Sequence, residues 1–214
     1  MRTLTVLLFA IMVNPVFSYS ETTYEKAMKK AEERLNQAAT IDDFREAANQ
    51  FDRIGDMEKD KWLPQYHAAY AKVMMASIEE DPLKKDPFLD AAQLNLDAIE
   101  KLDHDESEKL ALEGFLIMIR MSVSLDRGME LGMDCGMIVN QAYTMNNQNP
   151  RAVLMLAQFK FGSAQYMGQD TSESCAMFEE SLELLEQPEN KKSEPFLPAW
   201  GKDMALILQQ QCQN

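Results

Sequence analysis

Apolar side chains recur at spacings of three and four along most of the chain, which places them on one face of an α-helix. Between residues 149 and 185 this pattern occurs twice. Asn149 and Pro150 are suited to begin the first helix, and Gly168 interrupts the pattern before a second helix begins near Asp170. Two adjacent amphipathic helices cannot bury both apolar faces alone, so this segment predicts further helix pairs of the same kind.

The same spacing elsewhere in the chain predicts seven more helices and no strands. The expected ranges are residues 22–39, 40–54, 62–81, 86–102, 105–121, 127–145 and about 197–212. In the range 86–102 we expect Leu94 and Ala98 on the buried face. The pattern therefore predicts an all-α protein.

Small or compact residues recur at similar places in successive helix pairs. Near the end of each second helix they are 44, 44 and 39 residues apart: Ile54, Ala98, Ala142 and Ser181. Further small residues follow the first three of these after 15, 16 and 15 residues: Ala69, Gly114 and Ala157. Periods of this length are typical of helical repeats, in which small residues allow helices to pack closely.

Together with the aromatic residues Phe51 and Phe178 and the Asn149–Pro150 start, these positions make residues 22–187 resemble the tetratricopeptide-repeat family, including small secreted bacterial proteins with divergent repeats. The resemblance implies a right-handed superhelix of antiparallel helix pairs, with about four repeats and a capping helix at about 197–212. It also implies a non-catalytic scaffold that binds a protein or peptide. In that family the first helices line the concave face, where the candidate partner-binding residues are Tyr66, Tyr70, Phe115, Leu154 and Gln158. The alternative is that Tyr70 and Phe115 pack between helices.

The first residues are typical of a secretory signal peptide. Arg2 precedes an apolar run over residues 4–13 that is too short to span a bilayer comfortably, and small residues follow at Ser18 and Ser20. We expect residues 1–18 to be removed, with cleavage after Ser20 as the alternative. A single domain of residues 19–214 would then be periplasmic or secreted. No cysteine follows either site, which argues against a lipid anchor.

The chain is strongly acidic, with a formal net charge of −14. Loss of Arg2 leaves 20 basic against 35 acidic residues. This charge opposes nucleic-acid phosphates and anionic lipids. We expect no nucleic-acid partner and no stable membrane insertion of the mature chain, whereas the identity of the protein partner is left open.

The sequence lacks the motifs HExxH, GxSxG, GxxxxGK and CxxC, and its two histidines, His67 and His104, stand alone. The acidic run over residues 103–108 has Glu108 where a calcium loop needs glycine. We therefore interpret this run as a helix cap. No catalytic residue, cofactor or metal ligand is expected from these motifs.

The segment RGMELGMDCGM suggests an alternative function, soft-metal binding. Glycines and methionines each recur four residues apart within it, and thioether and thiolate ligands select Cu(I). The candidate ligands are Met129, Met133, Met137 and Cys135. The competing interpretation is that methionine fills the core and glycine permits close helix packing.

Three cysteines in an exported chain allow one disulfide. If the last two helices are antiparallel neighbours, Cys175 and Cys212 lie at similar heights. We predict that these two residues pair and that Cys135 stays a buried thiol.

Overall fold

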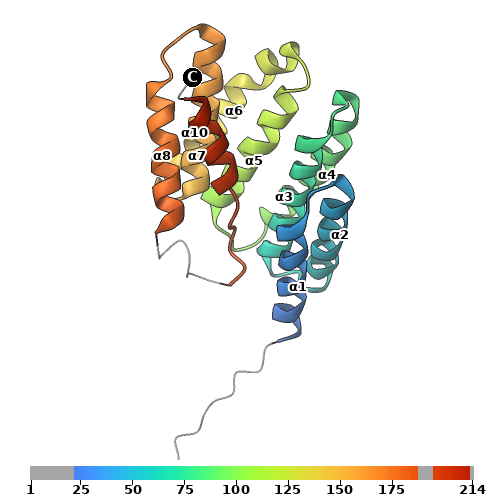
Figure 1. Cartoon of the computed structure of the whole chain (residues 1–214). Coiled ribbons are helices and arrows are strands. Elements are labelled where there is room, and N and C mark those ends of the chain that lie inside the picture. The colour runs from blue at the N-terminus through green and yellow to red at the C-terminus, as the bar shows by residue number, and fades with distance from the viewer. Residues whose placement is uncertain (1–21, 188–194, 213–214) are drawn as a thin grey trace, which may run out of the picture.

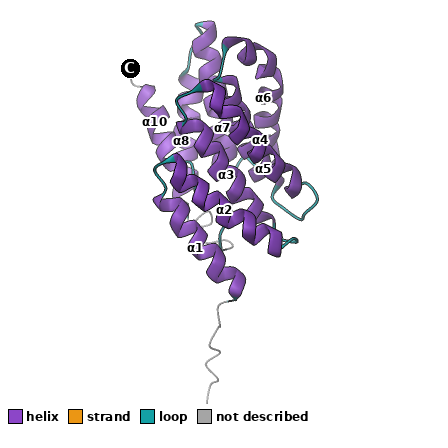
Figure 2. Cartoon of the chain, turned by 90° about the vertical axis from the view of Figure 1, so that its right-hand side faces the viewer, coloured by secondary structure: helices purple, strands orange, loops and turns teal. Residues whose placement is uncertain are grey.

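The computed structural model describes residues 22–187 and 195–212, and all regular secondary structure in these ranges is helical (Figures 1 and 2). The all-α prediction is therefore confirmed. The expected signal peptide, residues 1–18, lies outside the described residues. The helices are α1 (Thr23–Gln37), α2 (Ile41–Met57), α3 (Trp62–Ile78), η1 (Pro82–Lys84), α4 (Lys85–Ile99), α5 (Glu106–Met121), α6 (Leu125–Met145), α7 (Pro150–Met167), α8 (Ser172–Glu186) and α10 (Lys202–Gln211).

Local hydrogen bonds explain where several helices begin and end. Thr22 and Thr40 form capping boxes at the starts of α1 and α2. Asn149 caps α7 by accepting hydrogen bonds from the backbone of the first turn, which begins with a proline. Gly168 ends α7 with a left-handed backbone, φ 64°, which glycine adopts without steric cost.

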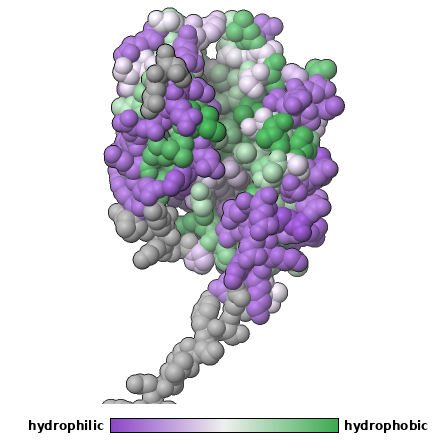
Figure 3. Space-filling model, in the orientation of Figure 1, coloured by the Kyte–Doolittle hydropathy of each residue, from purple (hydrophilic) through white to green (hydrophobic). Residues whose placement is uncertain are grey.

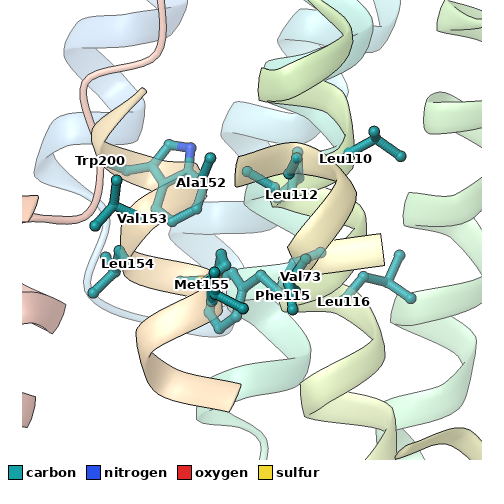
Figure 4. Packing of buried hydrophobic residues seen from close by; sticks show 14 of the residues in the cluster. Val73, Leu110, Leu112, Phe115, Leu116, Ala152, Val153, Leu154, Met155 and Trp200 are labelled. Carbon is teal, nitrogen blue, oxygen red and sulfur yellow. The ribbon is translucent and has the colours of Figure 1, made fainter. Parts of the chain in front are cut away.

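Each helix from α1 to α8 packs against the next one in the chain, and α3, α5 and α7 also contact one another in sequence. These three helices form an inner row. In Figure 1, α1, α2 and α4 lie on the α3 side of this row, and α8 and α10 lie on the α7 side. Figure 4 shows that side chains of α5 and α7 meet Trp200 in one apolar cluster. The main core cluster therefore extends from α3 to α10, whereas the buried residues of α1 and α2 pack with α3 in two smaller clusters.

The buried face of α4 differs from the prediction by one residue. Leu94 and Ala98 are exposed, and the buried residues are Leu89, Ala92, Asn95, Leu96 and Ile99. Asn95 explains the difference, because its polar side chain is buried among partners. Its Nδ2 donates to Asp52 Oδ1 (3.0 Å) and its Oδ1 accepts from Lys72 Nζ (2.6 Å). A satisfied amide can face the core, but the apolar pattern does not show it.

The last helix begins later than the expected 197–212, at Lys202. Residues 195–201, which we call the C-terminal strap, precede it without helical structure. Pro195 and Pro198 have no backbone N–H to donate to a helical hydrogen bond. The backbone of Gly201 is in the left-handed region, with φ 115°. These residues prevent the helix from extending further towards the N-terminus.

A disulfide joins Cys175 of α8 to Cys212 after α10, two residues that are 37 positions apart in sequence, and Cys135 is a buried free thiol. We expect Cys212→Ser to lower the free energy of unfolding by about 3–4 kcal/mol, because the bond closes a long loop in the unfolded chain. Urea unfolding measures this loss. A reducing agent should produce the same loss in the unmodified protein and none in the variant. Non-reducing peptide mapping that shows a Cys135 linkage or three free thiols would contradict the pairing.

Candidate functional site: a groove beside the C-terminal strap

A groove of about 1130 Å³ separates the first helices from the C-terminal strap. Residues of α1, α2 and α3 form one wall, and the strap, α10 and the end of α8 form the other. Figure 3 shows the surface hollowed between these two sides. The groove is thus built from the two ends of the chain.

Four side chains of α3, with different functional groups, line this groove. His67, Tyr70, Met74 and Ser77 all line it, at spacings of three, four and three residues along one helical face. An imidazole, a phenol and a thioether therefore lie along one wall.

Trp200 anchors the opposite wall. Its ring stacks on Tyr70 with centroids 5.2 Å apart and an interplanar angle of 15°, and on Phe115 at 5.8 Å and 25°. The indole is buried, and its Nε1 donates a hydrogen bond to Tyr66 Oη at 2.9 Å. The strap is therefore held against the inner helix row by both stacking and a polar contact.

Tyr66, which accepts the hydrogen bond from Trp200, also donates one to a buried ion pair. Tyr66 donates its hydroxyl to Glu108 Oε2 (3.2 Å), and the same carboxylate accepts from Arg151 Nε (2.7 Å) and Nη2. Burial, and then the Glu108 charge, raise the pKa of the Tyr66 phenol well above its ordinary value. The phenol is therefore neutral and serves as a donor. This chain of contacts links α3, α5 and α7 to the strap.

His67 also holds the strap. Its Nε2 lies 2.8 Å from the carbonyl oxygen of Phe196, so this nitrogen carries the proton and donates. The imidazole stacks on Phe51 with centroids 5.0 Å apart, and burial lowers the pKa of His67 to about 4. His67 is therefore neutral near pH 7, and its Nε2 is not free to act as a base or metal ligand.

Glu32 is a second unusual titratable group in the groove. Its Oε1 lies 3.9 Å from His67 Nε2, and burial raises the pKa of its carboxyl to about 7. The folded chain thus binds the Glu32 proton more tightly than the unfolded chain does. The stability that this group contributes is fully present below about pH 4.5 and is lost as the pH rises through 7.

We expect Glu32→Gln to raise the free energy of unfolding at pH 8 by about 1–2 kcal/mol and to leave it nearly unchanged at pH 4. The amide removes the cost of holding a charge in a partly buried site. Urea unfolding at both pH values measures the difference, and the opposite contribution of His67 cancels because both proteins contain it. Glu33→Gln, at an exposed neighbour, is the control and should change neither value. An equal change at both pH values would contradict titration of Glu32.

The candidate partner-binding residues are dispersed. Tyr66, Phe115 and Leu154 are buried in the core, so their side chains are not accessible to a partner in this structure. Tyr70 lines the groove, whereas Gln158 is half-buried and does not. The three buried residues all belong to the main core cluster, and the strap covers two of them, because Trp200 stacks on Phe115 and donates a hydrogen bond to Tyr66.

The candidate Cu(I) ligands do not converge. Cys135 is fully buried beside Gly114, and burial raises the pKa of its thiol to about 12. Met129, Met133 and Met137 are 64%, 77% and 57% exposed on the opposite side of α6. A thiol and thioethers on opposite helix faces cannot bind one ion. Within the described ranges, no group of three His, Cys, Asp or Glu side chains is placed to hold a metal.

Four residues of the groove do not stand out in the sequence as a site: Glu32, His67, Phe196 and Trp200. A signal was present in the segment PFLPAW, which combines two prolines with three large apolar residues. Such a segment cannot form a regular helix and needs an apolar surface to cover it.

These features define an all-helical protein with a ligand-sized groove beside its inner helix row. No family model and no curated protein match the chain, so the tetratricopeptide repeat stays a resemblance. The fold is similar to that of the HusA haemophore from Porphyromonas gingivalis, with a TM-score of 0.78 and 23% sequence identity. The match covers 91% of this chain and 95% of the haemophore. No helix among the described residues is long and apolar enough to cross a membrane.

Proposed function

We propose that this protein is an exported, non-catalytic binding protein that holds haem in the groove. The observation that carries this proposal is the groove itself, whose lining includes Tyr70 and Trp200, one from each side, stacked on one another. The similarity of the fold to a haemophore supports the same ligand class. The disulfide agrees with an oxidising location outside the cytoplasm.

The dimensions and lining of the groove suit a large, flat, mostly apolar ligand. Its volume of about 1130 Å³ is slightly above the usual range of about 300–1,000 Å³ for small-molecule sites. Met74, Ile207 and Leu208 add apolar surface beside the aromatic rings. Met74 carries a thioether, a group that ligates haem iron in other proteins, and its use would not break the hydrogen bond that His67 makes.

Charge contributes little to this mode of binding. The two basic groove residues are already paired, Arg151 with Glu108 and Lys202 with Glu186. Stacking and apolar burial must therefore supply most of the affinity, and we expect haem binding to depend only weakly on salt.

The test is a haem titration of the mature protein, followed by the Soret absorbance and by quenching of tryptophan fluorescence. We expect Tyr70→Ala to weaken binding by at least about tenfold, because an aromatic anchor of the groove is lost. Tyr166→Ala is the matched control, since Tyr166 is exposed on α7 and outside the groove. Melting temperatures of both variants exclude unfolding as the cause.

The proposal is contradicted if the unmodified protein does not bind haem, or if Tyr70→Ala and Tyr166→Ala bind it equally well. The variant Met74→Leu then tests whether the Met74 thioether ligates the haem iron. A changed Soret position with nearly unchanged affinity would show that the thioether ligates the metal, whereas an unchanged spectrum would show that Met74 provides only apolar contact.

A further inference from the structure

The outward side of α6 carries an apolar row and an acidic row with nothing packed on them. We call this surface the α6 outer face. The apolar row consists of Met129, Met133 and Met137, and the acidic row of Asp126, Glu130 and Asp134. Each row repeats every four residues, so the two run side by side along about three helical turns. Figure 2 shows α6 at the opposite edge of the molecule from α10, and the face contributes no residue to the groove.

Close packing fixes which side of α6 faces outward. A Cβ at Gly114 of α5 would lie 2.4 Å from Val139 Cγ1, and a Cβ at Gly136 would lie 2.9 Å from the ring of Phe159 on α7. These contacts leave no room for α6 to rotate. The methionine row therefore cannot turn into the core, and its exposure follows from the fold.

Two glycines of α6, Gly128 and Gly132, have no close neighbour among the residues that the structure describes. Nothing lies within 4 Å of the place that a Cβ at Gly128 would occupy, and at Gly132 the nearest such atom is Met121 Cε at 3.9 Å. Each costs roughly 0.5–1 kcal/mol relative to alanine in a helix. Both glycines lie on the same helical face as the buried Cys135 and Val139, at spacings of three and four residues, so they are not part of the α6 outer face.

The negative charge of the α6 outer face favours a basic partner. Arg127 is the only basic residue of α6, and its guanidinium donates to both carboxylate oxygens of Asp86 on α4 at 2.6 and 2.7 Å. The outer face is therefore acidic without a neutralising cation of its own helix. Methionine side chains adapt to varied apolar surfaces and are frequent at binding faces that accept amphipathic helices.

We propose that the α6 outer face binds a basic amphipathic helix of another protein. The partner's apolar residues would cover the methionine row, and its Lys or Arg side chains would pair with the acidic row. A second copy of this chain fits less well, because a two-fold contact through the same face would oppose two acidic rows. An anionic membrane is repelled by the same carboxylates.

The test uses the full mature protein without haem, so its result does not depend on the proposed function of the groove. The probe is a fluorescent 18-residue helical peptide of leucine and lysine with a benzophenone photocrosslinker, measured by anisotropy at low and high salt. We expect binding that weakens as salt increases, no binding of the same peptide with glutamate in place of lysine, and crosslinks within residues 125–137.

Two triple variants test the two rows of the face. We expect each to weaken binding of the peptide by at least about tenfold at low salt. The variants are Asp126→Asn/Glu130→Gln/Asp134→Asn and Met129→Gln/Met133→Gln/Met137→Gln.

Matched controls change the same kinds of residue elsewhere on the surface. They should weaken binding less than about threefold. The controls are Glu33→Gln/Asp56→Asn/Glu183→Gln, which changes the net charge equally, and Met57→Gln/Met167→Gln, at two exposed methionines.

Several results would overturn the proposal. They include equal effects of the control and outer-face variants, or crosslinks that map outside α6. Binding of phosphatidylglycerol vesicles that the methionine variant abolishes would assign the face to a membrane. Self-association in sedimentation experiments that the same variant abolishes would assign it to a second copy of the chain.

Discussion

Arg151→Met is expected to lower the free energy of unfolding by about 3–5 kcal/mol, because it leaves a buried carboxylate without its charged partner. The side chains of Arg151 and Glu108 are each only 7% exposed, and Glu108 accepts from both the guanidinium and the Tyr66 hydroxyl. Without Arg151, the fold must either bury an uncompensated charge or keep Glu108 protonated. Denaturant unfolding of the variant measures the loss.

A double-mutant cycle with Glu108→Leu separates the pair from its surroundings. The double variant should lose much less than the sum of the two single losses, because no buried charge is left without a partner. Lys202→Met is the exposed control, since its ion pair with Glu186 is more than half exposed on both sides and should contribute little to stability. Additive single losses would show that Arg151 and Glu108 act independently.

Trp200→Ala is expected to destabilise the protein by about 3–5 kcal/mol, the cost of removing a large buried aromatic side chain. The indole fills the space between Tyr70 and Phe115, and its Nε1 donates to Tyr66. The variant should also release the C-terminal strap, which limited proteolysis detects as cleavage within residues 195–201 under conditions that leave the unmodified protein intact.

Trp200→Phe separates the two contributions of this residue. The ring still stacks, but the Tyr66 hydroxyl loses its indole donor, so we expect a smaller loss of about 1–2 kcal/mol and an intact strap. Equal losses in Trp200→Ala and Trp200→Phe would show that the hydrogen bond dominates. No loss in either variant would contradict the role of Trp200 as the anchor of the strap.

Helix α4 shows that an apolar pattern alone does not always predict which face of a helix is buried. Leu94 has the side chain of a core residue and faces solvent, whereas Asn95 has the side chain of a surface residue and is buried. The face was decided by Lys72 and Asp52, which come from other helices and satisfy the Asn95 amide. Their effect on α4 is not visible in the sequence of α4 itself.

The α6 segment shows the same limit for chemistry. The spacing of methionine and glycine predicts two helical rows, but spacing alone does not show whether Met133 and Cys135 meet on one side of the helix. The contact of Val139 with Gly114 turns Cys135 into the core and leaves Met133 outside. A metal set that looked compact in sequence is therefore divided between two faces.

The sequence by itself determined the all-α class, the ranges of the helices to within a few residues at most boundaries, and the caps that begin and end several of them. These properties depend on residues three or four positions apart, so a local pattern contains them. Only the tertiary structure decided that residues 195–201 cover the inner helix row and complete a groove. That arrangement depends on Trp200 meeting Tyr66, 134 residues earlier in the chain, and such a contact leaves no local pattern in either segment.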